Sequence, residues 1–246
     1  MRHRHGRGVR TAEGPHGSDP NEDPQAKQGP APTAGDDRFV AALTKARVIA
    51  IVRGPYQVPQ YAEIVDALVE GGLSLVELTV EQPHAVEAIR RLAPQLPRDV
   101  WLGAGTVRTI EHAERAVEAG ARFLVSPSFD AGVARFAKEA DVPYLPGVQT
   151  PTEVDAARAA GCSAVKLFPA HHLGPTYLKA IKAPLHDVNF VPTGGIGPED
   201  ANTWISAGAC AVGVGGFLVA PGDAPSEIRE RAQAMVEALK GEKTDG

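Results

Sequence analysis

Short apolar runs alternate with amphipathic stretches along the chain from about Arg38 onward. Each run has the length of a buried strand, and the stretches between the runs repeat apolar residues at the helical period. The runs predict strands at 48–52, 75–80, 100–105, 123–126, 143–147, 164–168, 190–193 and 211–215. Helices are expected between the strands, for example at 61–70, 110–119, 154–160 and 201–207.

This alternation predicts the fold class. Strands that are separated by helices pair in parallel, because each crossover carries a helix. Eight such units favour a single closed (β/α)8 TIM barrel of the α/β class, preceded by a short N-terminal helix. An open, doubly wound sheet is the alternative, and a G-x-G-x-x-G turn after the first strand would support it. The chain has only Arg53-Gly54-Pro55 there, which weakens that alternative.

The first 36 residues differ from the rest of the chain. They are rich in Gly, Pro, His and Asp and have almost no large apolar side chains. Such a segment cannot bury enough surface to offset the entropy cost of ordering it. We therefore predict a disordered tail at 1–36, with its histidines solvated rather than metal-bound, and one barrel domain at 37–241.

Four segments share a pattern in which a helix ends on glycine and an apolar strand follows. The glycines are Gly72, Gly120, Gly161 and Gly208, and their separations of 48, 41 and 47 residues each span about two strand–helix units. The segments are therefore predicted to carry the second, fourth, sixth and eighth strands. Alternate strands of a barrel place side chains in the same interior layer.

Glu77 and Lys166 are charged residues inside two of these apolar strands. Each stands five residues after its glycine, Gly72 or Gly161, so we expect both side chains to meet near the barrel axis. One interpretation is a buried ion pair that closes the core. The other is a Schiff-base enzyme, because a poorly solvated lysine has a lowered pKa and attacks carbonyl carbon while a carboxylate moves protons.

Residues at the carboxyl ends of other strands favour the enzymatic interpretation. Thr106 follows the third strand and Thr193 ends the seventh, and barrel enzymes keep their sites at these ends. Gly194-Gly195 and Gly215-Gly216 follow the seventh and eighth strands. Loops at those two places often bind phosphate through free backbone N–H groups.

Composition narrows the classes of partner. The chain of 246 residues has a net charge of −5 at pH 7, so no basic field is available to hold nucleic acid. No apolar run is long enough to span a membrane, and the basic start MRHRHGRGVR lacks the apolar stretch of a secretory signal. Two cysteines fit a reducing compartment. We predict a cytoplasmic protein with no membrane or nucleic-acid partner and no metal.

Six strings stand in a fixed order along the chain: Gly71-Gly72…Glu77-Leu78-Thr79, Gly103-Ala104-Gly105-Thr106-Val107, Val125-Ser126-Pro127, Pro146-Gly147-Val148, Lys166-Leu167-Phe168-Pro169-Ala170 and Pro192-Thr193-Gly194-Gly195-Ile196. With them, the chain from about Arg38 to Leu239 resembles the 2-keto-3-deoxy-6-phosphogluconate (KDPG) and 2-keto-4-hydroxyglutarate (KHG) aldolases. The resemblance implies a cofactor-independent class I aldolase with a (β/α)8 barrel, usually a homotrimer. It implies that Lys166 forms the Schiff base and that Glu77 is the general acid and base.

The resemblance also implies the residues that bind the substrate. Arg53 matches an arginine after the first strand and is a candidate for an anionic group of the substrate. The residues that match the lining of the pyruvate pocket are Thr106, Pro127 and Phe168. The residues that match the loops around the distal phosphate are Thr193, Gly194, Gly195, Gly215 and Gly216.

Two positions depart from the family pattern. Some members carry an arginine four residues after the glutamate, where this chain has Glu81, and a carboxylate there repels the carboxylate of pyruvate. We expect Arg53 and the backbone at Thr106 to bind that carboxylate instead. A family serine in the last loop is replaced by Gly216, which removes a hydrogen bond to phosphate and favours a shorter or unphosphorylated 2-keto-4-hydroxy acid.

The predicted reaction is the reversible cleavage of a 2-keto-4-hydroxy acid to pyruvate and an aldehyde, a step of carbohydrate metabolism. The aldehyde is glyceraldehyde 3-phosphate for KDPG and glyoxylate for KHG. Two alternatives remain open. One is an isomerase or synthase that acts on a phosphorylated compound and does not require Lys166. The other is a non-catalytic ligand-binding barrel in which Glu77 and Lys166 form a core ion pair.

Overall fold

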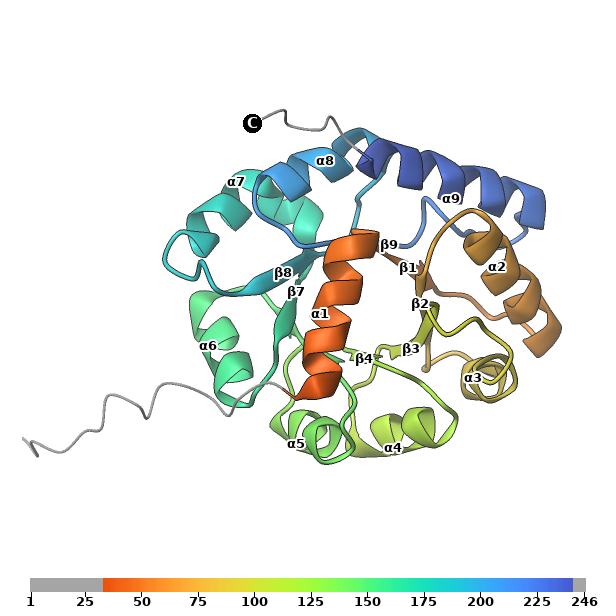
Figure 1. Cartoon of the computed structure of the whole chain (residues 1–246), viewed down its shortest axis with the longest axis horizontal. Coiled ribbons are helices and arrows are strands. Elements are labelled where there is room, and N and C mark those ends of the chain that lie inside the picture. The colour runs from red at the N-terminus through yellow and green to blue at the C-terminus, as the bar shows by residue number, and fades with distance from the viewer. Residues whose placement is uncertain (1–32, 241–246) are drawn as a thin grey trace, which may run out of the picture.

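The computed structural model describes residues 33–240, in which strands and helices alternate (Figure 1). The strands are β1 (Val48–Val52), β2 (Leu75–Thr79), β3 (Trp101–Gly105), β4 (Leu124–Val125), β5 (Tyr144–Leu145), β6 (Gly147–Val148), β7 (Ala164–Leu167), β8 (Asn189–Pro192) and β9 (Val212–Val214). The helices are α1 (Ala34–Ala46), α2 (Val58–Glu70), α3 (Ala85–Leu92), α4 (Ile110–Glu118), α5 (Ala131–Glu139), α6 (Pro151–Ala159), α7 (Ala170–Lys182), α8 (Pro198–Ser206) and α9 (Pro225–Leu239). Each of the predicted strands is therefore present.

The strands pair in parallel and form two sheets, with the orders β5-β4-β3-β2-β1-β9 and β6-β7-β8. The predicted fifth strand is divided into β5 and β6 at Pro146, a residue that has no N–H to donate to a ladder. A parallel bridge between Thr193 and Gly213 links the end of β8 to β9. The fold is thus of the predicted α/β class, with curled parallel sheets surrounded by helices (Figure 1).

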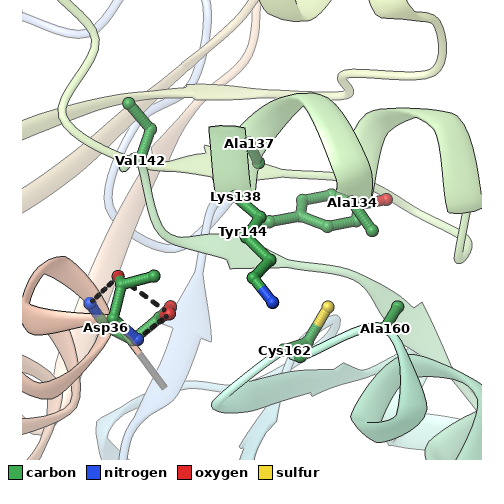
Figure 2. A pocket seen from close by; sticks show the side chains of 10 residues that line it. Asp36, Ala134, Ala137, Lys138, Val142, Tyr144, Ala160 and Cys162 are labelled. Atoms are coloured by element: carbon green, nitrogen blue, oxygen red, sulfur yellow. Dashed lines mark hydrogen bonds between the residues drawn. The ribbon is translucent and has the colours of Figure 1, made fainter. Parts of the chain in front are cut away.

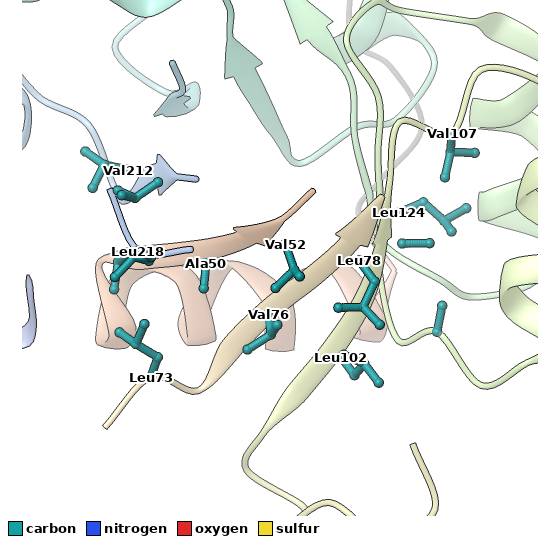
Figure 3. Close-up of a cluster of buried hydrophobic side chains, with 14 of the residues drawn as sticks. Ala50, Val52, Leu73, Val76, Leu78, Leu102, Val107, Leu124, Val212 and Leu218 are labelled. Carbon is teal, nitrogen blue, oxygen red and sulfur yellow. The ribbon is translucent and has the colours of Figure 1, made fainter. Parts of the chain in front are cut away.

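Successive strand residues point to opposite sides of the sheets, and two separate apolar clusters result. The outer cluster packs the strands against the helices, and Figure 3 shows part of it, including Val76, Leu78 and Leu102. The inner cluster contains Leu75 and Phe123 from the strands. Period-two alternation therefore separates a helix-facing side of each strand from an interior side.

Helix α1 covers the amino ends of the strands (Figure 1). Its Phe39 and Leu43 are almost fully buried in the inner cluster, beside Ile49, Leu75 and Phe123. Burying each of these side chains contributes about 1.5–3 kcal/mol. Because α1 occupies the amino ends, the interior remains accessible from the carboxyl ends of the strands.

The first turn of α1 corrects the predicted domain boundary. Thr33 caps the helix: its Oγ1 accepts a hydrogen bond from the Asp36 N–H at 3.2 Å, and its own N–H donates to Oδ2 of Asp36 at 3.0 Å. Figure 2 shows hydrogen bonds at Asp36 as dashed lines. Residues 34–36, which we had assigned to the disordered tail, are therefore helical. The boundary at 36 was wrong by three residues because a capping box starts the helix. Residues 1–32, with the tail histidines, and residue 241 lie outside the described residues.

Three helices begin earlier than the sequence pattern indicates. Helices α2, α6 and α8 start at Val58, Pro151 and Pro198, each three residues before its predicted start. Each has a proline in its first turn. Proline is accommodated there because the first helical N–H groups need no partner within the helix. In α6 and α8 the first turn holds only proline and polar residues, so the apolar periodicity begins after it.

Candidate active site

Glu77 and Lys166 both lie on the interior side of their strands. Glu77 stands two residues after Leu75 in β2, and Lys166 stands two residues after Ala164 in β7. Leu75 and Ala164 belong to the inner cluster, so the period of two turns both charged side chains inward. The spacing from the repeat glycines predicted this common orientation.

The two charged groups are almost completely buried, with 1% of Glu77 and 6% of Lys166 exposed. Burial raises the pKa of Glu77 and lowers the pKa of Lys166, and the charge of each partly opposes the shift of the other. The ion pairs within residues 33–240 do not include a Glu77–Lys166 pair at 4.0 Å or less. The charges of Lys166 and Glu77 thus influence each other, although the two groups do not form an ion pair.

A cavity of about 450 Å³ opens at the carboxyl ends of the strands. This volume suits a small-molecule substrate. The residues that line it are Ile51, Arg53, Lys166, Phe168, Thr193, Gly194, Gly195, Gly215, Gly216, Val219, Ala220 and Pro221. The structure therefore brings Lys166 together with most of the predicted substrate-binding residues, although these come from distant parts of the chain.

Three predicted site residues do not line this cavity. Glu77 lies next to Gly105, whose lack of a side chain leaves room for the carboxylate. Thr106 accepts a hydrogen bond from NH2 of Arg53 at 3.0 Å. Pro127 follows β4, and its carbonyl packs so closely against Gly147 that a β-carbon at residue 147 would lie 2.1 Å from the oxygen. Thr106 is thus connected to the cavity through Arg53, whereas Pro127 has a packing contact.

Phe168 lies near the amine of Lys166. Nζ of Lys166 lies 5.4 Å from the centre of the phenyl ring. Phe168 is itself 37% exposed. The ring is thus part of the apolar surroundings of Lys166, whose burial lowers the pKa of the amine.

The two glycine loops offer backbone donors to the cavity. Gly194 and Gly195 have φ angles of 107° and 69°, which lie in the left-handed region that favours glycine. In the described part of the chain, their N–H groups and that of Gly216 have no hydrogen-bond acceptor. Free N–H groups in such turns form a concave site for an anion.

The loop after β9 supplies lining residues that the sequence did not indicate, Val219, Ala220 and Pro221. Asp223 holds this loop: it accepts hydrogen bonds from the Ala220 N–H at 2.6 Å and from NH1 of Arg231 at 2.7 Å. Ile51, the remaining unpredicted lining residue, stands two residues before Arg53 and was detectable from strand alternation. The sequence pattern gives no comparable indication that the loop residues Val219, Ala220 and Pro221 reach the cavity.

Arg53 has a partner that the sequence analysis did not anticipate. Its NH1 lies 3.3 Å from Oε1 of Glu81, the residue that departs from the family pattern. Glu81 therefore pairs with Arg53, in addition to any repulsion that it exerts on an anionic substrate.

Comparison with known proteins identifies the family. The model of the KDPG and KHG aldolases matches residues 40–235. This chain belongs to the KDPG and KHG aldolase family. It is 36% identical over 204 residues to the "Probable 2-dehydro-3-deoxy-6-phosphogalactonate aldolase" of Rhizobium meliloti (strain 1021), a match that covers 82% of this chain and 95% of the relative. The resemblance noted in the sequence is confirmed, and the aldolase is an aldehyde-lyase.

Two further similarities concern related aldolases. The "2-dehydro-3-deoxy-phosphogluconate aldolase" of Treponema pallidum (strain Nichols) is 42% identical over 156 residues, covering 63% of this chain and 73% of the relative. A solved structure is described as KDPG aldolase from Legionella pneumophila with pyruvate captured at low pH as a covalent carbinolamine intermediate. It superposes with a TM-score of 0.73 at 30% identity and covers 80% of this chain and 97% of that one.

No group of three or more His, Cys, Asp or Glu side chains is placed to hold a metal ion within residues 33–240. In the same range, none of the helices combines the length and the apolar character that crossing a bilayer requires.

Proposed function

We propose that this aldolase uses Lys166 as the Schiff-base lysine to cleave a 2-keto-3-deoxy-6-phospho sugar acid into pyruvate and glyceraldehyde 3-phosphate. The observation that carries the proposal is a buried, unpaired amine that opens into a substrate-sized cavity with a buried carboxylate nearby. The gluconate and galactonate forms differ in configuration at C4, and relatives named for each are similar to this chain. KHG, which yields glyoxylate, is the shorter candidate substrate.

The chemistry begins with the neutral amine. Nζ of Lys166 attacks the C2 ketone, and Glu77 supplies the proton with which the carbinolamine loses water, leaving a protonated imine. The C3–C4 electrons then move toward the imine while Glu77, directly or through a water, accepts the proton of the C4 hydroxyl. The aldehyde leaves, and the enamine is protonated at C3. Hydrolysis of the imine releases pyruvate and restores the amine.

The remaining site residues bind and orient the substrate in this proposal. Arg53 and the backbone at Thr106 bind the carboxylate of the keto acid, while Phe168 and Pro127 border the pyruvate carbons. The free N–H groups of Gly194, Gly195 and Gly216 support a distal phosphate site. The loops assigned to this phosphate contain Thr193, Gly194, Gly195, Gly215 and Gly216.

The strands form a closed (β/α)8 barrel in this proposal, with β5 and β6 as one strand interrupted at Pro146. The bridge between Thr193 and Gly213 supports closure between β8 and β9, and β9 also pairs with β1. In an open, doubly wound sheet, β9 would not contact both β1 and the end of β8. A closed barrel also explains why residues from β1 and β7 line one cavity.

Family resemblance further suggests a homotrimer, and the two free cysteines, Cys162 and Cys210, are compatible with work in the reducing cytoplasm. Analytical ultracentrifugation of the purified chain tests the first point. A mass of three times 25.8 kDa is expected, and a monomer at working concentration would reject the trimer.

Borohydride reduction in the presence of pyruvate tests the central claim. We expect a covalent adduct on Lys166 and loss of activity, whereas Lys166→Met should form no adduct and remain folded. An isomerase or synthase would leave no adduct in the wild-type protein. A non-catalytic barrel would retain its ligand affinity in Lys166→Met, and either result rejects the aldolase mechanism. Pyruvate release from KDPG, its galactonate epimer and KHG then ranks the substrates.

A further inference from the structure

Arg53 joins the carboxyl ends of three neighbouring strands. It follows β1, and its NH1 lies 3.3 Å from Oε1 of Glu81, just beyond β2. Its NH2 donates to Oγ1 of Thr106, directly after β3, at 3.0 Å. Because Arg53 also lines the cavity that contains Lys166, this arrangement sets the charge at one side of the candidate site.

Glu81 is held in a defined position relative to Arg53. The turn that carries it is fixed on both sides: the Val80 N–H donates to the Gly105 carbonyl at 2.9 Å, and the Gln82 N–H donates to the Thr79 carbonyl at 3.1 Å. The Glu81 side chain is 30% exposed, against 59% for Arg53. The carboxylate is therefore the more enclosed partner, and it constrains the guanidinium at the edge of the cavity.

The ion pair changes what Arg53 offers to a substrate. A guanidinium has five N–H donors, so the ion pair with Glu81 and the hydrogen bond to Thr106 leave donors free for a carboxylate. The positive charge, however, is offset by Glu81, and a substrate carboxylate at Arg53 approaches a like charge. The pair also acts on the reactive amine in opposite directions, since Arg53 lowers the pKa of Lys166 and Glu81 raises it.

We propose that Glu81 is a specificity-determining residue: it positions Arg53 against Thr106 and offsets its charge, so that the site selects only weakly for a carboxylate beside the ketone. This inference rests on the proposed function, in which Arg53 meets the carboxylate of the keto acid. It implies that neutral 2-keto compounds compete better with pyruvate here than they would beside an unpaired arginine.

The experiment measures the concentration of pyruvate, or of its neutral methyl ester, that gives half-maximal borohydride trapping at Lys166. In Glu81→Gln the pyruvate value should fall about threefold or more, because removing an exposed charge partner changes binding by this order. The value for methyl pyruvate should change little, because the ester carries no charge. Glu81→Asp keeps the charge and should stay close to wild type. Added salt should reduce the difference between Glu81→Gln and wild type.

Glu70→Gln is the matched control, because Glu70 forms a surface ion pair with Arg229 at 3.0 Å and neither residue lines the cavity. It should behave as wild type with both probes. The proposal is wrong if Glu81→Gln changes the half-maximal trapping concentrations of pyruvate and methyl pyruvate equally, or if it raises that of pyruvate. It is also wrong if Glu81→Gln leaves pyruvate unchanged and alters only the affinity for glyceraldehyde 3-phosphate in the condensation. Absence of trapping in wild type would reject the aldolase mechanism itself, a distinct outcome.

Discussion

The carboxylate of Glu77 occupies the space that a side chain at Gly105 would fill. A β-carbon at residue 105 would lie 2.5 Å from Oε1 of Glu77 and 2.9 Å from its carboxyl carbon. Glu77 pairs with Gly103 in the β2–β3 register, and Gly105 pairs with Thr79. The missing side chain at Gly105 therefore leaves the space that the buried acid occupies.

Gly105→Ala should displace Glu77 and lower kcat strongly while the protein remains folded. The displaced carboxylate can no longer exchange protons with the bound substrate. Loss of a general acid and base lowers the rate about 10²–10⁴-fold. Gly103→Ala is the matched control on the same strand, because its β-carbon would meet the ring of Phe123 at 2.5 Å instead. It should lower the thermal midpoint more than it lowers kcat. Steady-state kinetics and thermal unfolding of both variants decide, and equal kcat values would contradict this account.

Imine formation should respond to pH as expected for an amine of lowered pKa. Burial lowers the pKa of Lys166, so the neutral, nucleophilic form is present at lower pH than for an exposed lysine. The rate of borohydride trapping should rise with pH and level off below the ordinary lysine range. A rate that continues to rise through that range would show that the pKa of Lys166 is not lowered.

The glycine at residue 216 should account for any weakened preference for phosphate. A β-carbon there meets no atom within 4 Å, so serine fits without displacing a neighbour. Gly216→Ser should raise kcat/KM for KDPG about tenfold, because a hydroxyl adds a hydrogen bond to a charged acceptor. The value for KHG should stay constant, since KHG has no phosphate. Equal gains on both substrates in a pyruvate-release assay would rule out this explanation.

Asp223→Asn should loosen the loop that borders the cavity. Losing the charged acceptor for Ala220 and Arg231 should cost about 1–2 kcal/mol and raise KM more than it lowers kcat. The hydrogen bond from Arg231 holds the pKa of Asp223 below its usual range, so its contribution is present at neutral pH. The contribution is lost as pH falls through that lowered pKa. The free energies of unfolding of wild type and Asp223→Asn should therefore converge in strongly acidic solution.

Urea unfolding at a series of pH values measures this difference. Asp187→Asn is the control, because Asp187 pairs with Arg158 on the surface, where the Asp187 side chain is 47% exposed. It should change the free energy of unfolding by less than about 0.5 kcal/mol. A difference between wild type and Asp223→Asn that grows on acidification would contradict the assigned role of Asp223.

Local sequence patterns predicted the elements and part of the site. Alternating periods located the strands, because side-chain burial repeats every two residues in a strand and about every 3.6 residues in a helix. The offset of Glu77 and Lys166 from Gly72 and Gly161 predicted their shared inward orientation, since each strand begins at a fixed distance from its helix stop. Three helix starts, those of α2, α6 and α8, were placed one turn too late, at helices whose first turn contains a proline.

By itself, the sequence determined which residues form strands, which charged groups turn inward, and the family, because these properties depend on near neighbours along the chain. Only the tertiary structure decided that Arg53 pairs with Glu81, that Asp223 holds the loop bordering the cavity, and that Gly105 makes room for Glu77. These contacts join the ends of different strands and loops. Their distances depend on how strands pair and how loops return, which no local pattern encodes.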